Sequence, residues 1–286
     1  MIFIDNMQIS PVNNIYNNHI NFGINLQSKK LQFKEDDFYV HIRGYGHHSG
    51  WAKKIKETAD KAVKFIRENC DLESILKNIT QGVTEANQLP LDVNKRLHTG
   101  ILRIQRNGWR YGSEWNDFSL ITRYGDPSRK NKYAIYADRL NYTIKHPLKN
   151  PYRDIGLTRP KRDADKGNFM DHAHEKFINN AFKRVNSIYD IFCKKYILNE
   201  AKEEDLSDIN SLIAEIRWIL AHSTPWERGS DAISNTFIRS IYKAAGIKAY
   251  PLKRGVSLDL EAYCTNLDEY KNNFANYFIK KPEIVE

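Results

Sequence analysis

The residues best suited to chemistry lie in a short turn between two apolar-patterned segments. His222 is followed by residues 225–230, which read Pro-Trp-Glu-Arg-Gly-Ser. The first turn of a helix leaves backbone N–H groups unpaired and carries a partial positive charge, so a helix that begins at Gly229 and Ser230 is suited to holding a phosphate. Arg228 adds a guanidinium that can bind phosphate through two hydrogen bonds. The pattern predicts an anion-binding turn for a phosphate-bearing ligand such as a nucleotide.

The same residues also fit an ordinary capped turn. Ser230 can accept a hydrogen bond from the backbone, and Asp231 can balance the partial charge of the helix start. Arg228 can pair with its neighbour Glu227 or with Glu215. In both interpretations the turn has a rigid support, because apolar residues recur at helical spacing on either side of it.

The order of residues around the turn resembles the Fic/Doc (Fido) motif of nucleotidyltransferases, written His-Pro-Phe-x-(Asp/Glu)-Gly-Asn-Gly-x-x-Arg. In that family the histidine deprotonates the target hydroxyl, and the glycine loop with its arginine holds the nucleotide phosphates. The resemblance implies that His222 is the catalytic base. Glu227 is the second expected catalytic residue, which would balance Arg228 or hold a metal ion beside the phosphate.

The resemblance also implies a nucleotide-binding set. Trp226 matches the motif phenylalanine, Gly229 the first loop glycine and Arg239 the late arginine, and Arg228 and Ser230 complete the set. The chain departs from the motif by two extra residues before the proline and by Ser-Asp-Ala in place of the Asn-Gly portion. The implied cofactor is ATP.

A second segment resembles the first motif of ADP-ribosyltransferases. Residues 38–46 contain a strand candidate that delivers Arg43 immediately before a loop glycine. In that family an arginine or histidine at this point orients the NAD pyrophosphate or ribose, and Ser119 and Thr122 would supply a later motif. The alternative function is therefore an ADP-ribosyltransferase with NAD as its cofactor. The other interpretation is a strand end with a polar tip.

Two further groupings invite a binding interpretation. His172 and His174 are expected on the first turn of a helix, where residues two apart point in different directions, so we expect no metal site there. Residues 103–124 combine aromatic and basic side chains that can stack on bases. Aromatic residues are also common in strands, so nucleic-acid binding is not expected.

Composition indicates a basic protein that does not depend on disulfide bonds. The chain has 286 residues, with 44 Lys and Arg against 35 Asp and Glu, and its net charge of +9 favours acidic partners. Its three cysteines are widely spaced and favour a reducing compartment. We find no apolar run of membrane-spanning length and no Sec signal peptide.

Residues 1–30 are rich in Asn and Ile and are interpreted as a flexible leader. Their composition resembles the uncleaved N-terminal signals of bacterial type III secreted effectors. The resemblance implies a bacterial effector or toxin that is secreted and acts on a host protein in the host cytoplasm.

The elements that would position these residues are mainly helical. Apolar residues at helical spacing predict helices near residues 50–66, 71–79, 168–196, 207–220 and 230–246. Asp71 is expected to cap the second of these, and Gly82 to end it. Alternation and an Asn-Gly turn predict a small antiparallel sheet in residues 100–138, in the middle of the chain. Three prolines predict a long loop in residues 145–166. The expected fold class is α+β, mainly α, with an α+β lobe in residues 31–150 and a helical lobe in residues 151–286.

Three classes of function follow from these patterns. The leading prediction is an effector-type transferase that uses a nucleotide to modify a host protein by Fic-like nucleotidyl transfer, and it requires His222 and Arg228 to line one cleft. The alternatives are NAD-dependent ADP-ribosyl transfer and a non-catalytic effector that binds a host protein. The non-catalytic alternative predicts that both residues are packed or exposed without a cavity.

Overall fold

The computed structural model describes residues 31–38, 49–87, 99–105, 136–164 and 167–285. Helices dominate these residues, and they are accompanied by two antiparallel pairs of short strands. The predicted fold class, α+β and mainly α, is confirmed. The chain from Leu31 onward forms one compact unit, and the expected division into lobes at residue 150 stays a prediction. The expected leader, residues 1–30, lies outside the described residues.

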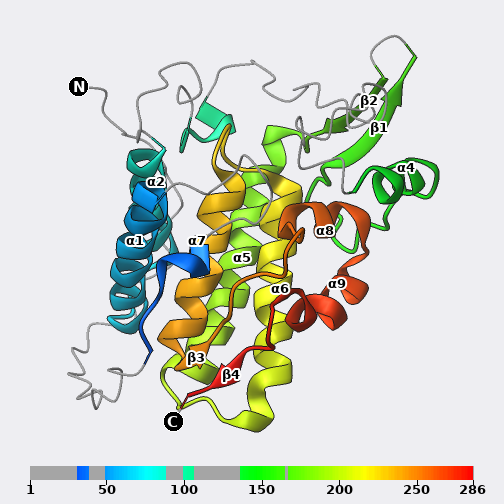
Figure 1. Ribbon diagram of the computed structural model, residues 1–286. Helices are drawn as coiled ribbons and strands as arrows, with labels where there is room; N and C mark the ends of the chain where they lie inside the picture. The colour runs from blue at the N-terminus through cyan, green and yellow to red at the C-terminus, as the bar shows by residue number, and fades with distance from the viewer. Residues whose placement is uncertain (1–30, 39–48, 88–98, 106–135, 165–166, 286) are drawn as a thin grey trace. The chain divides into compact units, whose positions relative to one another are not determined.

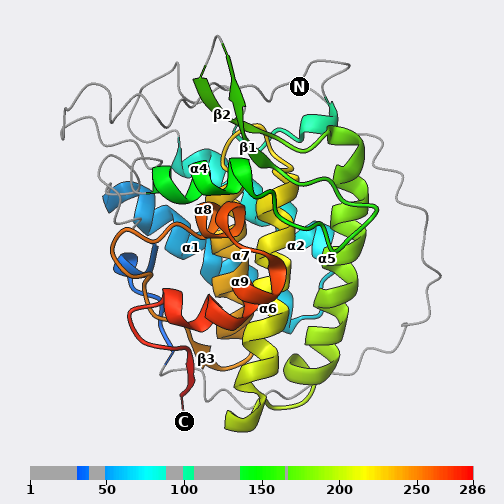
Figure 2. The ribbon, with the colours of Figure 1, turned by 90° about the vertical axis from the view of Figure 1, so that its right-hand side faces the viewer.

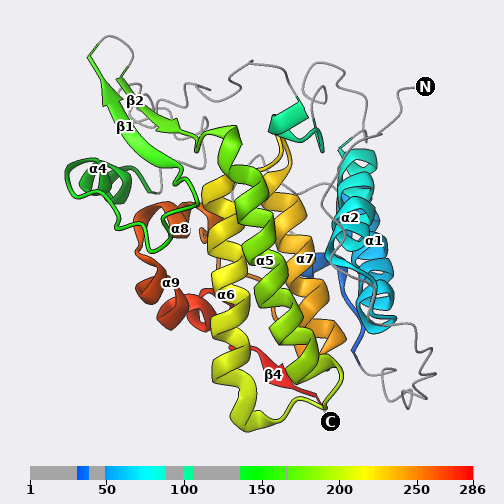
Figure 3. The same cartoon turned by 180° about the vertical axis from the view of Figure 1, so that it is seen from behind.

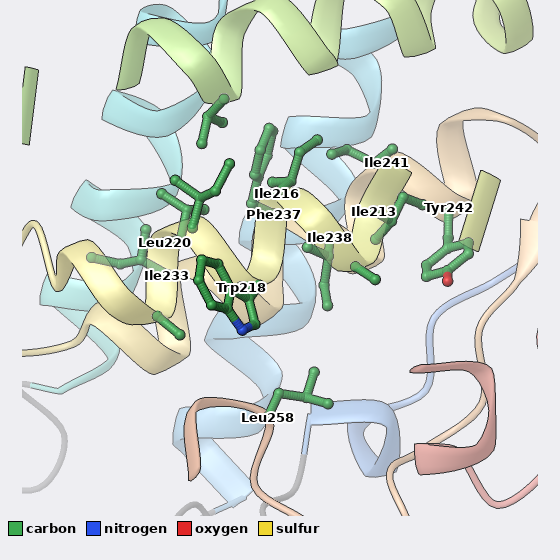
Figure 4. Packing of buried hydrophobic residues seen from close by; sticks show 14 of the residues in the cluster. Ile213, Ile216, Trp218, Leu220, Ile233, Phe237, Ile238, Ile241, Tyr242 and Leu258 are labelled. Atoms are coloured by element: carbon green, nitrogen blue, oxygen red, sulfur yellow. The ribbon is translucent and has the colours of Figure 1, made fainter. Parts of the chain in front are cut away.

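Three long helices form the centre of the fold (Figure 1). They are α5 (Ile178–Phe192), α6 (Leu206–Ser223) and α7 (Ser230–Ala244). α6 contacts α5 and α7 as well as two shorter helices, and it is apolar around most of its circumference, as expected for an enclosed helix. Figure 4 shows the apolar side chains of α6 and α7 packed together, among them Ile216 and Phe237.

Four further helices of the described residues cover opposite sides of this centre (Figures 1 and 3). α1 (Ser49–Arg67) and α2 (Leu72–Ala86) pack on α7, whereas α8 (Leu258–Cys264) and α9 (Leu267–Asn273) pack on α6. A 3-10 helix, Phe274–Tyr277, follows α9. Figure 2 shows α8 and α9 in front of the long helices.

α2 continues past Gly82, the point at which the sequence predicted its end, and runs to Ala86. Asp71 caps it as expected, accepting a hydrogen bond from the Ser74 backbone at 2.8 Å. Gly82 lies inside α2, where a Cβ would come within 2.0 Å of the Thr58 hydroxyl oxygen of α1. The glycine therefore permits the close contact of two helices, and its prediction as a helix terminator was wrong.

The main sheet lies in residues that the sequence assigned to a loop and a helix. β1 (Arg159–Asp163) pairs antiparallel with β2 (Gly167–Asp171), with Pro160 opposite Met170. β1 reads Arg-Pro-Lys-Arg-Asp, which has low strand propensity. It is stabilised by its pairing and by packing on α4 (Ala137–Lys145), so tertiary contacts outweigh local preference. A second pair joins β3 (Ile247–Lys248) to β4 (Glu283–Ile284).

The predicted sheet in residues 100–138 is wrong wherever the structure describes these residues. Leu102 forms an isolated bridge, residues 103–105 form a 3-10 helix, and Ala137 begins α4. Residues 106–135 lie outside the described residues.

The long helix predicted from residue 168 begins later, at Ile178. Met170 and Ala173 are buried as the apolar stripe predicts, but they lie in and just after β2. The backbone N–H and C=O groups of residues 167–171 are used in pairing with β1 and are not available for a helix. The helical spacing of apolar residues was therefore misleading before residue 178.

Candidate functional site

Two left-handed backbone positions shape the turn between α6 and α7. Thr224 ends α6 with φ 39° and ψ 63°, and Gly229 precedes α7 with φ 87°. A Cβ at residue 229 would lie 3.2 Å from the Thr99 Cγ2 atom. Glycine is therefore needed both for the positive φ and for the close approach of Thr99. α7 begins at Ser230, as predicted.

Residues 99–103 brace this turn through backbone hydrogen bonds. Gly100 N donates to the Arg228 carbonyl oxygen at 3.1 Å, and Arg103 N donates to the Pro225 carbonyl oxygen at 2.9 Å. These bonds join segments more than a hundred residues apart and fix the turn independently of any ligand. A site held in this way is preorganised.

The Arg103 side chain adds a buried brace that the sequence did not reveal. Its Nη1 donates to the carbonyl oxygens of Ser223 and Thr224 at 3.2 and 3.1 Å and to the Thr224 hydroxyl at 3.0 Å, while Nη2 donates to the Ala173 carbonyl oxygen at 2.6 Å. Burial lowers the pKa of this guanidinium. The bonds satisfy carbonyl groups at the end of α6 and hold Thr224 in its left-handed conformation.

His222 lies in the protein core. Its side chain is 0% exposed, with Nδ1 3.0 Å from the Thr158 carbonyl oxygen and Nε2 3.0 Å from the Ala262 carbonyl oxygen. The rings of Trp218 and Tyr263 pack against it. Burial lowers the pKa of His222 to about 4, although both carbonyl groups act in the opposite direction. A hydroxyl group of another protein has no access to either ring nitrogen.

The expected nucleotide-binding set divides between the core and the surface. Trp226, Glu227 and Arg239 are buried, with 4%, 8% and 4% of their surfaces exposed. Arg239 donates to the backbone carbonyl groups of residues 249 and 250, at 3.3 and 3.2 Å. Trp226 and Arg239 thus lie inside the fold, and their part in nucleotide binding stays a prediction. His222, which is buried, and Arg228, which is exposed, do not line one cleft.

Arg228, Gly229 and Ser230 stay together at the surface. The Arg228 side chain is exposed, and the two residues after it are half-buried. The Ser230 hydroxyl donates to the Trp226 carbonyl oxygen at 2.9 Å and accepts from the Trp226 N–H at 3.2 Å, so it closes the turn. Gly229 supplies no side-chain cap to α7. An exposed guanidinium therefore adjoins a helix start without a side-chain cap, which is the geometry of anion sites at helix N-termini.

A second arginine lies against the same helix turn and was missed in the sequence. Arg217 of α6 is fully buried, its Nε donates to the Asn235 side-chain oxygen at 2.9 Å, and its Nη2 pairs with Asp231 in the first turn of α7. Within the described part of the chain, Nη1 has no hydrogen-bond partner. Burial acts to lower the pKa of Arg217, but Asp231 and other groups outweigh it and the pKa is raised. A permanent cation thus supports the turn. The sequence feature that could have pointed to Arg217 is its charge, because the other residues of the run 216–221 are apolar.

His172 is the other residue whose position the sequence did not predict. It follows β2 and is half-buried, with Nδ1 3.4 Å from the Thr224 hydroxyl oxygen. His174 instead caps a 3-10 helix, accepting from the Lys176 N–H at 3.2 Å. The placement of both histidines on one helix turn was wrong because β2 runs to Asp171. The fold brings a partly solvent-accessible imidazole to the end of α6.

The described residues form an open hollow of about 400 Å³ at a different place. It lies at the start of α6, the opposite end from Thr224. Its lining residues are Lys195, Tyr196, Asn199, Glu200, Lys202, Glu204 and Asp205.

Arg43, Ser119 and Thr122, the basis of the ADP-ribosyltransferase alternative, lie outside the described residues. That alternative therefore stays a prediction.

None of the described helices has the length and hydropathy of a membrane span.

Comparison with known proteins identifies a family. No curated protein matches the chain. The family model AvrB_AvrC, described as avirulence protein, matches residues 129–281, which is more than half of the chain and includes α4 to α9. This match includes the α6–α7 turn but does not show a Fic/Doc motif, so that resemblance stays a prediction. The chain belongs to the AvrB_AvrC family of avirulence proteins and is a bacterial effector that is secreted to act on a host.

Proposed function

We propose that this effector binds a nucleotide through its phosphates at the start of α7 and uses it to modify a host protein. The observation that carries the proposal is the juxtaposition of two guanidinium groups with one helix start. Arg228 is exposed close to the start of α7, and the buried Arg217 pairs with Asp231 in the first turn of α7. Backbone N–H groups, the helix dipole and an accessible guanidinium together favour a phosphate.

Asp231 is the acidic group that opposes an anion at this point. Its carboxylate forms an ion pair with Arg217 and accepts a hydrogen bond from the Asn235 amide at 3.2 Å. The negative charge is therefore largely offset within the protein. The exposed Arg228 remains the cation that adjoins the helix start from the solvent side.

Transfer to a host hydroxyl also requires a group that accepts its proton. His222 is enclosed, whereas His172 is half-buried and contacts Thr224 at the beginning of the turn. We assign the proton-accepting role to His172. With ATP, the hydroxyl oxygen would bond to the α-phosphorus, the bond to pyrophosphate would break, and the neutral imidazole would take the proton.

The experiment is to incubate the purified protein with host-cell extract and isotopically labelled ATP or NAD, and to identify labelled host proteins by mass spectrometry. We expect one or few labelled proteins with the wild type. Arg228→Ala and His172→Gln should each lower the labelling rate by at least about tenfold, since each removes an interaction with the reacting groups. Arg153→Ala, which removes another exposed arginine, should leave it unchanged. Equal labelling by the wild type and Arg228→Ala would contradict the proposal.

The burial of His222 favours a second candidate, a non-catalytic effector that binds its host protein. If the protein is such an effector, no host protein should become labelled with either nucleotide. The protein should instead form a stable complex with a host protein, and this complex should form without His172. Comparing complex formation by the wild type and His172→Gln in the same extract separates the two functions.

A further inference from the structure

Two antiparallel segments near the C-terminus form a narrow ribbon on the protein surface. The C-terminal ribbon consists of residues 247–254 and 277–284, which include β3 and β4 (Figure 1). Beyond these strands, Lys253 N donates to the Tyr277 carbonyl oxygen and Ile279 N donates to the Pro251 carbonyl oxygen, each at 2.9 Å. The pairing fixes which side chains face inward and which face solvent.

The inner side of the ribbon is anchored in the core. Leu252 and Phe278, which form a backbone bridge, are buried with 9% and 2% of their surfaces exposed. Arg239 of α7 donates to two carbonyl groups of the first segment, and its guanidinium carbon lies 5.9 Å from the centre of the Phe278 ring. The ribbon is therefore a firmly attached part of the fold.

The exposed surface of the ribbon is strongly basic. The two segments contain five basic residues and one acidic residue, Glu283. All five basic side chains are exposed: Lys248, Lys253, Arg254, Lys280 and Lys281. Glu283 pairs with Lys280, so the ribbon carries a clear excess of positive charge. Such a surface attracts anions over roughly the Debye length of 8 Å at physiological salt.

Apolar and aromatic groups lie among these cations. Ile279 is 59% exposed, one of the largest exposures of an apolar side chain in the described residues. The ring of Tyr250 is flanked by the ammonium groups of Lys248 and Lys280, at 4.7 and 5.2 Å from its centre. The C-terminal ribbon thus presents an exposed aliphatic side chain, a tyrosine and several lysines. This combination suits a membrane interface, where apolar groups contact the acyl boundary and cations contact the charged headgroups.

We propose that the C-terminal ribbon is a docking surface for an anionic lipid membrane. The basic side chains contact acidic headgroups, and Ile279 enters the headgroup and acyl boundary. A nucleic acid would use the same charges but would gain little from Ile279, whereas a membrane interface accepts both the cations and the aliphatic side chain, which is why the exposed isoleucine favours a lipid surface. The inference is independent of the nucleotide site at α7.

The test is co-sedimentation of the full chain with vesicles of phosphatidylcholine alone and with vesicles containing equal amounts of phosphatidylcholine and phosphatidylserine. We expect binding to the acidic vesicles only, weakened by salt. The triple variant Lys253→Ala, Arg254→Ala and Lys281→Ala should bind at least about tenfold more weakly, because each cation near an acidic surface contributes. The matched control Lys53→Ala, Lys61→Ala and Lys77→Ala removes the same charge from α1 and α2 and should change binding far less.

Ile279→Ser provides a second variant that leaves the charge unchanged. It should weaken vesicle binding by roughly tenfold, as expected for loss of a buried aliphatic side chain, and should not affect binding to heparin, a soluble polyanion. The proposal is overturned if the wild type ignores acidic vesicles, if the two triple variants lose binding equally, or if Ile279→Ser binds vesicles like the wild type.

Discussion

His222 and His172 show that burial decides what an imidazole can do in this protein. The sequence drew attention to His222 because it precedes the turn, yet both of its ring nitrogens face backbone carbonyl groups inside the core. His172 was interpreted as a surface residue on a helix, yet it lies beside Thr224 with partial access to solvent. The histidine that the sequence motif singled out, His222, is therefore enclosed, and the histidine with access to solvent is His172.

The burial of His222 predicts a specific dependence of stability on pH. Its folded pKa of about 4 lies below the ordinary value of 6.5, so the unfolded chain takes up the proton first as the pH falls. Stability is therefore lost as the pH falls below 6.5, until the folded protein is also protonated near 4. Between pH 7 and pH 5 the wild type should lose about 2 kcal/mol more than His222→Asn, measured by urea unfolding at both values. Identical losses in the two proteins would show that His222 does not titrate as a buried group.

The α6–α7 turn shows how an element can be held by residues distant in sequence. Gly229 approaches Thr99 closely, and the Arg103 side chain binds the carbonyl groups at the end of α6. The first turn of α7 is thereby fixed in place. The proposed anion site depends on this fixed geometry, because N–H groups bind a phosphate only when they point toward it.

Substituting Gly229 should therefore lower the free energy of unfolding more than substituting a glycine with a similar φ angle but open surroundings. Gly246, with φ 77° and open space within 4 Å of the position that a Cβ would occupy, is the matched control. Gly246→Ala should lose about 1 to 2 kcal/mol from left-handed strain alone. Gly229→Ala should lose roughly 1 kcal/mol more, because its Cβ also presses on Thr99 in a packed region. Chemical denaturation of both variants measures the difference, and equal losses would mean that the 99–103 segment does not press on the turn.

For the molecule as a whole, the sequence predicted helices better than strands. The apolar stripe in α5, the start of α7 at Ser230 and the cap of α2 at Asp71 are local patterns, and all are present. The β1–β2 sheet was missed because its charged first strand is stabilised by contacts with distant residues rather than by local preference. Local patterns determine helices directly, whereas a strand also depends on its partner.

The candidate site was predicted only in part for the same reason. Arg228, Gly229 and Ser230 are adjacent in sequence and remain together at the surface. Arg217 and His172 reach the turn through the packing of α6 on α7 and the course of β2, which a local pattern cannot reveal. Arg239, matched to the late arginine of the Fic/Doc motif, binds the backbone carbonyl groups of residues 249 and 250.

The measurement that tests the central claim most directly is isothermal titration calorimetry of the purified protein with ATP and NAD, repeated with Arg228→Ala and with Arg153→Ala as the control. The account predicts on the order of micromolar binding of one nucleotide, retained in the control and weakened at least about tenfold in Arg228→Ala, because a charge-assisted hydrogen bond is lost. No binding of either nucleotide, or equal binding by the wild type and Arg228→Ala, would contradict a phosphate site at the start of α7.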